Sequence, residues 1–487
     1  MRIPQAFVSA CCALFCSAQQ PFDLDTSFRT PIIQRNVNSI LPQQDGKLIL
    51  SGRMLFPGAL NEHLLVRIDQ DGILDPTFYA SSLGGGKLTS WGGQFYVAAN
   101  STVRRILPDG HQDPSFIGMN TGPYFTSGQG GDYHVYPDGR VLMTGVHVLS
   151  DSIRGFEGFY SLVWFSNTGY LDTTATHRKC DGDISTIAQQ PDGKFICSGF
   201  YSTFEGAPTG RILRTLPDGA LDTTFSTDLV WGAAQGLSVL PDGRILGSGY
   251  LLHSGTSDTL KIIRLLPDGT LDTTFNNQLA VTHDLWGSYL ELRHRVLPDG
   301  RIVLLGQFDH VNGEPRGGVA ILDADGELLN DAFTGPGCGE VLNSAQIHVQ
   351  GVIDLVPSPE GHYYICGLWR GYDDGTVNDT TQRFVSRLYG LDVGVREVPV
   401  KEPGASLLIH PNPASTWVVV RYDLGPQPAN ASLSIRDLMG REVHRAAISA
   451  ATGQLLWDTR QVPAGSYAVV LLGAASGPVT QQLIVQP

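Results

Sequence analysis

A ten-residue phrase recurs along the chain and constrains its fold more than any other feature. Its clearest copies are LPDGALDTTF at 216–225 and LPDGTLDTTF at 266–275. Weaker copies stand at 69–78, 107–116, 166–175 and 323–333, and a truncated copy, FDLDTSF, stands at 22–28. The aspartate of the LDTTF segment falls at Asp25, Asp75, Asp113, Asp172, Asp222, Asp272 and Asp331. Self-similarity at such spacings predicts a repeat architecture.

A second turn phrase lies between successive copies of the first, for example QPDGKFICSG at 190–199 and LPDGRILGSG at 240–249. In both phrases proline presets φ, aspartate bonds its own backbone and glycine takes a positive φ. Each unit therefore predicts a four-stranded antiparallel sheet, with tight turns after its first and third strands. Such a sheet cannot bury both faces alone, and radial stacking of several sheets forms a β-propeller.

Seven units of this kind predict an all-β fold with a seven-bladed β-propeller over residues 19–390. The seventh unit has no LDTTF segment after Gly390, whereas the chain begins with an unaccompanied copy at Phe22–Phe28. We expect this N-terminal strand to complete the last blade and remove the open edge. The combination PDGKxLxxG and LxPDGxLDxTF resembles the delta-60 repeat of exported bacterial proteins, which implies a scaffold rather than an activity.

The first eighteen residues read as an export signal. Arg2 supplies a positive charge, residues 6–15 form an apolar run, and Ala18 is a suitable cleavage position. The apolar run is too short to span a bilayer permanently, and no later run approaches the necessary length. We therefore expect a signal peptide and no transmembrane segment.

The C-terminal part has a different character. Residues 391–405 form a Val- and Pro-rich linker, and seven short β-runs over 406–487 predict a small β-sandwich. The order HPNPAS, DLMGREV, PAGSYAVVL and a final apolar strand resembles the type A sorting domain of the Bacteroidota type IX secretion system. The matching motif residues are Pro411, Asn412, Pro413, Gly440, Gly465 and Tyr467. The resemblance implies export through the periplasm by the type IX machinery, removal of the tail, and release or attachment at the cell surface.

Four cysteines remain beyond the signal, and an even number in an exported chain predicts disulfides. Cys197 and Cys366 hold the same repeat position, and each has one other cysteine upstream. We expect the pairs Cys180–Cys197 and Cys338–Cys366, with buried free thiols as the alternative. The absence of CxxC and CxxH spacing argues against zinc bound by these cysteines.

The acids Asp69, Asp71 and Asp75 have the spacing of oxygen ligands in a calcium loop. Leucine replaces the first acid in the best-preserved copies, at Leu216 and Leu266. We therefore expect the repeated aspartates to form turns and caps, with calcium as the weaker alternative and no other cofactor. The adjacent pairs His283-Asp284 and Asp309-His310 have no assigned role.

Known catalytic signatures, including GxSxG, HExxH and the P-loop, are absent from the sequence. The formal net charge of −14 argues against a nucleic-acid partner, and we expect a monomer. The aromatic residues that interrupt the repeat are candidates for a ligand face: Trp231, Trp286, Trp369 and Tyr372.

The leading interpretation is a secreted or cell-surface, non-enzymatic propeller that binds a glycan, a matrix component or a protein. The alternatives are a polysaccharide hydrolase or lyase with acidic residues in the central channel, and a purely structural spacer.

Overall fold

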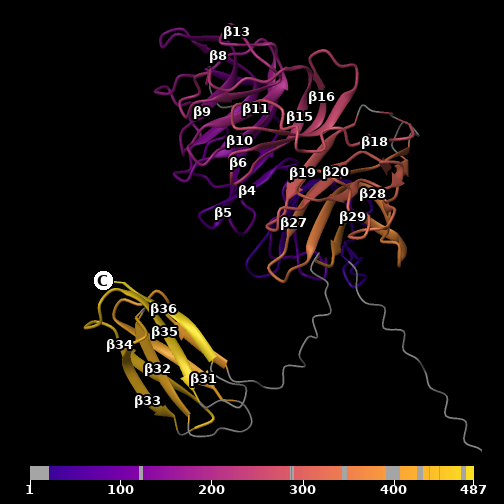
Figure 1. Cartoon of the computed structure of the whole chain (residues 1–487). Helices are drawn as coiled ribbons and strands as arrows, with labels where there is room; N and C mark the ends of the chain where they lie inside the picture. Colours follow the sequence, from indigo (N-terminus) through magenta and orange to yellow (C-terminus); the bar gives the residue numbers. More distant parts are fainter. Residues whose placement is uncertain are drawn as a thin grey trace, which may run out of the picture. The chain divides into compact units, whose positions relative to one another are not determined.

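The computed structural model describes residues 21–119, 124–285, 287, 290–342, 348–390, 406–424, 431–437, 439–448, 450–472 and 479–486. All regular secondary structure within these ranges is β-strand, as the sequence predicts, and they include no helix that could span a membrane. The predicted signal peptide and linker lie outside the described residues. The chain divides into two compact units, Met1–Val393 and Gly394–Pro487 (Figure 1).

Seven sheets of the first unit carry the repeat. Their strands, in chain order, are β1 (Gln34–Pro42), β2 (Leu48–Leu55) and β3 (His63–Ile68); β4 (Leu88–Trp91), β5 (Gln94–Ala99) and β6 (Thr102–Ile106); β7 (Phe125–Val135), β8 (Val141–Asp151) and β9 (Phe156–Phe165); β10 (Asp183–Gln189), β11 (Phe195–Phe200) and β14 (Ile212–Thr215); β15 (Leu229–Val239), β16 (Ile245–His253) and β17 (Thr259–Leu265); β19 (Leu292–Val296), β20 (Ile302–Gly306) and β23 (Val319–Leu322); and β27 (Gly351–Pro357), β28 (Tyr363–Asp373) and β29 (Asn378–Leu388), with β24 (Gly337–Cys338).

Short strands in the loops form smaller sheets: β12 (Thr203–Phe204) with β13 (Ala207–Pro208); β18 (Val281–Thr282) with β21 (His310–Val311) and β22 (Glu314–Pro315); and β25 (Val341–Leu342) with β26 (His348–Val349). The first strands of neighbouring large sheets contact one another, as β10 contacts β7 and β15, and β1 contacts β4 and β27. The first unit is therefore a β-propeller-like array of antiparallel sheets.

The LDTTF segment contributes a single β-bridge to its sheet rather than the full fourth strand that the sequence predicts. In the fourth sheet Leu221 bridges Thr215, and the backbone N–H of Asp222 donates to the carbonyl of Arg214 at 2.9 Å. Asp222 then accepts hydrogen bonds from the backbone N–H and hydroxyl of Thr224. This local turn bends the chain away from the sheet, so pairing ends after one bridge.

The N-terminal segment takes the LDTTF position in the seventh sheet. Leu24 bridges Leu388 of β29, and the N–H of Asp25 donates to the carbonyl of Arg387 at 2.9 Å. β1 also contacts β27 and β28, so the indigo start of the chain lies beside these orange strands in Figure 1. The contact predicted between the two ends of the repeat region is therefore present.

A β-bulge in the first strand explains the glycine that ends the second turn phrase. The register between β10 and β11 shifts between Ile184 and Thr186, and that between β15 and β16 shifts between Ala234 and Gly236. The bulged backbone approaches the facing strand so closely that a Cβ at Gly199 would lie 2.1 Å from a carbonyl oxygen. Only glycine fits at this point.

The second unit contains two antiparallel sheets that enclose one apolar core. The sheets are β30 (Ser406–His410), β31 (Trp417–Asp423) and β34 (Thr452–Asp458), and β33 (Glu442–Ile448), β32 (Ala431–Asp437), β35 (Gly465–Leu472) and β36 (Val479–Val485). Alternate residues of β31, β32 and β35 point inward, including Val418, Leu433 and Val469. This alternation is what the short β-runs of the tail predict.

Candidate functional site

Five of the seven repeated aspartates are each paired with an arginine, a pairing that we did not predict from the sequence. In the fourth sheet, Arg214 Nε donates to Asp222 Oδ2 at 2.8 Å, and its guanidinium lies 4.9 Å from the centre of the Phe225 ring. Its Nη1 donates to the carbonyl of Pro267 at 2.7 Å, in the turn phrase of the next sheet. We call this arrangement the arginine clasp.

The arginine clasp recurs in five sheets. Its arginines are Arg67, Arg105, Arg214, Arg264 and Arg387. Four of them stand eight residues before the aspartate, a spacing that is present in the sequence and could have revealed the pairing. Arg387 of the seventh sheet donates to the carbonyl of Gln70, in the turn phrase of the first sheet. The seventh and first sheets are therefore joined by the same kind of hydrogen bond as other neighbouring sheets.

The clasp keeps its carboxylates ionised. Burial raises the pKa of Asp222 and of Asp272, but hydrogen bonds from the neighbouring threonine and arginine outweigh burial and hold both pKa values well below the ordinary range. A group of this kind is a poor proton donor at neutral pH. These aspartates therefore stabilise the fold and do not form an acid–base pair.

One repeat position predicted from sequence was wrong. In the sixth sheet the backbone N–H of Leu329, not that of Asp331, donates to Ile321, the residue that stands where other sheets have the clasp arginine. Leu329 holds the seventh place of this copy, as Asp222 does in its own, and Asp331 stands two residues beyond it.

The calcium candidates do not come together as a ligand set. Asp69 Oδ1 accepts from the N–H groups of Asp71 and Ile73 and so forms a turn. Asp75 Oδ2 accepts from Lys47 and Arg67, both at 2.8 Å. Among the described residues, the three-membered cluster with ligand atoms close enough for one cation is instead Asp284, Asp309 and His310.

The predicted disulfides are absent, and all four cysteines are free thiols. Cys338 faces Tyr372 on β28, six residues beyond Cys366. At about 3.3 Å per residue the two cysteines stand roughly 20 Å apart along the strand, whereas a disulfide needs Cα atoms within about 7 Å. Cys180 Sγ lies 3.0 Å from the hydroxyl of Ser161 instead of bonding to Cys197.

Two of the four aromatic candidates are buried, and the ligand-face assignment for them was wrong. Trp369 and Tyr372 lie on β28, which pairs with β24, β27 and β29, so their rings enter the core. The Tyr372 hydroxyl donates to the carbonyl of Phe22 at 3.2 Å and so holds the N-terminal segment. Trp286 lies outside the described residues.

The fourth candidate, Trp231, belongs to an exposed aromatic surface. Its ring centre lies 5.6 Å from that of Tyr250, which in turn lies 6.0 Å from that of Phe200. The side chains of Trp231 and Phe200 are exposed. We call these three residues the aromatic patch; Phe200 comes from β11 and the other two from β15 and β16, so the patch bridges two neighbouring sheets.

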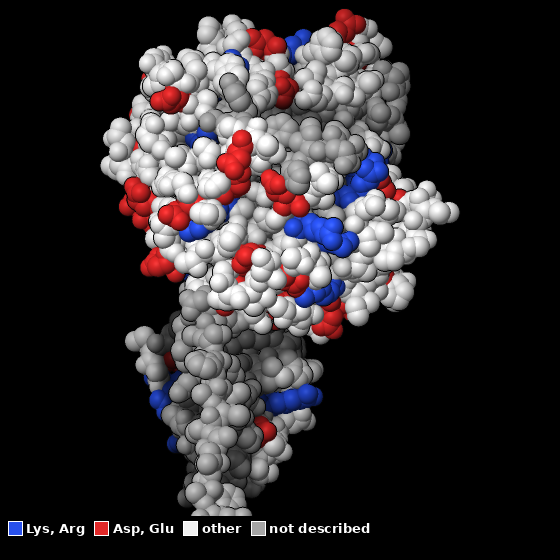
Figure 2. Space-filling model, turned by 90° about the vertical axis from the view of Figure 1, so that its right-hand side faces the viewer, with Lys and Arg blue, Asp and Glu red and all other residues white. Residues whose placement is uncertain are grey.

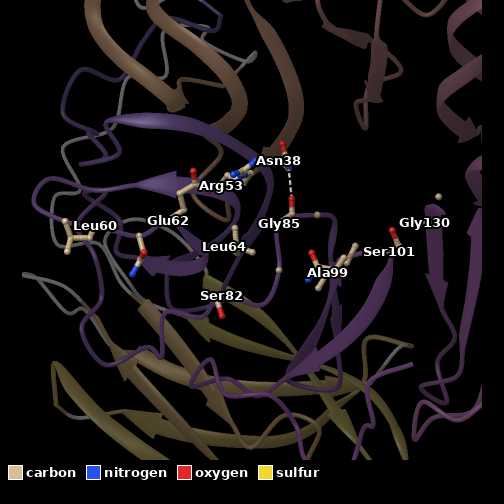
Figure 3. A pocket seen from close by; sticks show the side chains of 16 residues that line it. Asn38, Arg53, Leu60, Glu62, Leu64, Ser82, Gly85, Ala99, Ser101 and Gly130 are labelled. Carbon is tan, nitrogen blue, oxygen red and sulfur yellow. Dashed lines mark hydrogen bonds and ion pairs between the residues drawn. The ribbon is translucent and has the colours of Figure 1, made fainter. Parts of the chain in front are cut away.

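A cavity of about 850 Å³ lies over the first three sheets (Figure 3). β5 and β6 are joined by a two-residue turn, Asn100-Ser101, in which both residues have positive φ. Residues 56–62 join the equivalent strands β2 and β3. The tight turn of the second sheet leaves open the space that a longer loop would fill.

The lining of the cavity is polar but offers little acid–base chemistry. Asn38 Nδ2 donates to the carbonyl of Gly85 at 2.7 Å, and the backbone of three consecutive glycines is exposed to the cavity (Figure 3). The ionisable side chains among its lining residues are Arg53 and Glu62, joined at 2.8 Å. Hydrogen bonds from Arg53 and Arg35 lower the pKa of Glu62 despite the small opposing effect of burial. One ionised carboxylate does not provide the two that glycoside hydrolysis requires.

Charged groups of both signs share the surface. On the face drawn in Figure 2 the Lys and Arg side chains stand among Asp and Glu. On this face, positive charge is therefore not concentrated in one place.

The predicted sorting motif fastens the last strand of the second unit. Asn412 Nδ2 donates to the carbonyl of Gln482 at 2.8 Å, and its Oδ1 accepts from the N–H of Ile484 at 2.9 Å. Both flanking prolines, Pro411 and Pro413, follow cis peptide bonds. The Asn412 amide thus pairs with β36 as a backbone peptide group would.

The remaining motif residues have separate structural roles. Gly440 has a φ of 76° in the turn after β32, where Asp437 accepts two backbone N–H groups. Gly465 begins β35 opposite Val485, and the Tyr467 hydroxyl donates to the carbonyl of Pro463 at 2.6 Å.

Two family models match the chain. A β-propeller domain of unknown function, DUF5122, matches residues 43–78, 190–225, 240–275 and 297–328, and a secretion-system C-terminal sorting domain matches residues 408–486. No curated protein matches the chain.

Solved structures with a similar arrangement share little sequence with this chain. PorZ, a surface component of the type IX secretion system of Porphyromonas gingivalis, is 13% identical, with a TM-score of 0.34 and coverage of 93% of this chain. The extracellular domain of a putative hybrid two-component system from B. thetaiotaomicron is 11% identical, with a TM-score of 0.42 and coverage of 93%. The chain spans 66% and 57% of the length of these proteins.

A protein of unknown function from Bacteroides caccae is 11% identical, with a TM-score of 0.31. The match covers 58% of this chain and 92% of the Bacteroides caccae protein. The sorting domain directs its carrier to the cell surface or the extracellular space. The sequence repeat, the β-propeller-like sheets and the C-terminal domain are consistent with these two family models. The chain carries DUF5122 β-propeller repeats followed by a type IX secretion-system sorting domain.

Proposed function

We propose that this protein is a non-enzymatic glycan-binding propeller of the cell surface, and that the aromatic patch is where the glycan binds. The carrying observation is the row of three neighbouring rings, in which Phe200 and Trp231 are exposed and the half-buried Tyr250 lies between them. Pyranose rings present apolar C–H faces that pack on aromatic side chains, while their hydroxyls need hydrogen-bonding partners.

Carboxylates beside the patch provide such partners. Asp183 of β10 is the register partner of Phe200 on β11. Burial raises the pKa of Tyr250, and the negative charges of Glu291 and Asp183 raise it further. Glu291 precedes β19 and Asp183 begins β10, so they approach the patch from the two sheets on either side of Tyr250. A stacking surface flanked by hydrogen-bond acceptors suits a polyhydroxylated ligand better than an apolar one.

The scaffold that presents the patch is, in this proposal, a closed ring of seven blades with the N-terminal segment in the last. Two observations support closure: the bridge between Leu24 and Leu388, and the bond from Arg387 to Gln70 that repeats the clasp of other neighbours. A closed ring holds loops from different blades in fixed relative positions, as an aromatic patch shared by two sheets requires.

The full-length chain can be screened on an array of bacterial and host glycans, followed by titration of each hit. Trp231→Ala should weaken binding about tenfold or more, equivalent to at least about 1.4 kcal/mol. Tyr79→Ala is the matched control, because Tyr79 is also exposed and stacks on His111 outside the patch. Equal affinities of the wild type and the Trp231→Ala variant for every glycan would refute the assignment.

A glycan hydrolase or lyase is the second candidate. The observation that favours it is Asp183, whose pKa is raised by burial and which lies near the same tyrosine as Glu291. Two carboxyl groups beside a sugar platform are the parts that glycoside hydrolysis uses. Analysis of bound glycans for cleavage products distinguishes the two: cleavage that Asp183→Asn and Glu291→Gln both abolish would establish an enzyme.

Export through the C-terminal domain has its own test. A chain truncated after Gly404 lacks both sheets of the second unit and should remain in the periplasm, whereas the full chain should reach the cell surface or the medium. Normal export of the truncated chain would contradict the sorting role.

A further inference from the structure

Two His-Asp pairs that are separate in the sequence meet in one small sheet. β18 pairs with β21, with Thr282 opposite His310, and the N–H of Asp309 donates to the carbonyl of Thr282 at 3.1 Å. This pairing sets His283-Asp284 beside Asp309-His310. No sequence pattern connects the two pairs, because they belong to loops on either side of β19 and β20.

The ligand atoms of three of these residues converge. His310 Nδ1 lies 2.8 Å from Asp309 Oδ1 and 3.8 Å from Asp284 Oδ1, and one ligand atom from each residue lies within 4.8 Å of the other two. Two ligands of a tetrahedral ion with bonds of about 2.0–2.2 Å stand about 3.3–3.6 Å apart. The observed separations bracket that spacing, so a small shift of the exposed Asp284 side chain accommodates an ion.

The second oxygen of Asp309 fixes the geometry. Asp309 Oδ2 accepts the backbone N–H of Asp284 at 2.8 Å, which ties the two loops together and leaves Oδ1 on the side of His310. One carboxylate thus orients the neighbouring ligand and also presents an oxygen to the cluster. Support of this kind is typical of the groups that position metal ligands.

A buried histidine lies behind the cluster. His283 is 1% exposed, and its Nδ1 accepts the N–H of Leu285 at 3.1 Å. The same nitrogen stands 3.7 Å from Asp309 Oδ2, while Nε2 stands 3.9 Å from Glu340 Oε1. His283 therefore lies on the protein side of Asp309, whereas Asp284 is exposed and His310 is partly exposed.

We propose that Asp284, Asp309 and His310 form a binding site for a divalent transition-metal cation, with Zn²⁺ as the reference ion. Imidazole nitrogen combined with carboxylate oxygen suits zinc and its neighbours in the first transition row, whereas calcium takes oxygen ligands. Three protein ligands leave at least one coordination position for water or an external oxygen donor. The site stands independently of the glycan surface and gives this face of the propeller a second binding chemistry.

The test uses the full-length chain, stripped with a chelator and titrated with ZnCl₂ by calorimetry, with bound metal counted by mass spectrometry. The wild type should bind one Zn²⁺ and melt at a higher temperature with Zn²⁺ than with chelator, because the ion binds only the folded state. Asp284→Ala should weaken binding more than the roughly tenfold loss caused by removing a supporting group. Its side chain is 81% exposed, so the fold does not depend on it.

His310→Gln should abolish the bound equivalent, and Co²⁺ should give a visible absorption band in the wild type that this variant lacks. His111→Gln is the matched control: His111 forms an exposed pair with Asp109 at 3.4 Å, and its loss should leave zinc binding unchanged. Failure of the wild type to bind Zn²⁺ stoichiometrically, or binding by Asp284→Ala and His310→Gln as tight as that of the wild type, would overturn the proposal. A Ca²⁺ titration that displaces Zn²⁺ at equal concentration would overturn the choice of metal.

Discussion

Removal of the Arg387 side chain tests whether the contact between the two ends of the repeat region stabilises the propeller. Arg387 Nε donates to Asp25 Oδ2 at 2.7 Å, Nη1 donates to the carbonyl of Gln70, and the guanidinium lies 5.2 Å from the centre of the Phe28 ring. Arg387→Ala removes all three contacts at once. The first and seventh sheets would then lack the arginine clasp between them.

The expected cost follows from burial. The side chains of Arg387 and Asp25 are 14% and 6% exposed, so the substitution leaves a buried carboxylate without its cation. Breaking a buried pair in this way costs about 3–5 kcal/mol. Asp25 keeps the N–H and hydroxyl of Ser27 as donors, which places the expected loss near the lower end, at about 3 kcal/mol.

Urea denaturation of the full-length chain, followed by tryptophan fluorescence, measures this loss, because Trp369 is buried in the seventh sheet. Arg140→Ala is the matched control, since Arg140 pairs with Asp138 at 2.8 Å but both side chains are about half exposed. An exposed pair contributes about 0–1 kcal/mol. Asp25→Asn added to Arg387→Ala should cost little more, because the two residues act as one unit. A loss for Arg387→Ala no larger than that of the control would refute the reasoning.

Three further outcomes are expected. Gly249→Ala should destabilise the propeller by roughly 1–3 kcal/mol in urea denaturation, because its Cβ would lie 2.3 Å from the carbonyl oxygen of Ala233. Gly247→Ala, on the same strand, should be nearly neutral, since its Cβ would first meet a movable methyl of Ile212 at 3.3 Å. Alkylation should modify four thiols in the denatured chain lacking its signal, and Cys180 before the buried three in the folded chain; two modified thiols would indicate a disulfide. The clasp aspartates have folded pKa values below the ordinary 3.8, so their stabilisation is complete above that value and is lost as the pH falls through the folded pKa. The melting temperature should therefore be level between about pH 7 and pH 5 and fall below about pH 4, and a level profile down to pH 2 would contradict this.

The features that could be predicted from the sequence are those that a residue determines through its neighbours in the chain or that repeat along the chain. The turn phrases predict their turns because proline, aspartate and glycine each fix the backbone locally. The copy at Phe22–Phe28 predicts the contact between the chain ends because the seventh sheet lacks that piece. The arginine clasp belongs to this class as well, because the eight-residue spacing repeats in the sequence.

The incorrect predictions required knowledge of partners distant in the chain. Trp369 and Tyr372 interrupt the repeat, but β28 gains pairing on both sides and buries them. Cys338 and Cys366 share one sheet, but the register sets them far apart along it. The His-Asp cluster arises from the pairing of two-residue strands, for which no periodicity exists in the sequence.

The repeated contacts and the candidate sites lie in different parts of the sheets. The arginine clasp, the β-bulge and the tight turn use the same contacts in successive sheets. A substitution at one of these positions therefore destabilises the fold and does not readily create a binding site. The aromatic patch, the cavity and the His-Asp cluster all lie near the loop ends of the sheets, where the first strand begins and the second strand ends, and where neighbouring units differ in loop length and composition. The cavity depends on the tight turn Asn100-Ser101, the patch on residues at the ends of β11, β15 and β16, and the cluster on β18 and β21. A scaffold held together by repeated contacts on the turn side is free to vary its loops, and this freedom explains why the candidate sites all lie on the loop side.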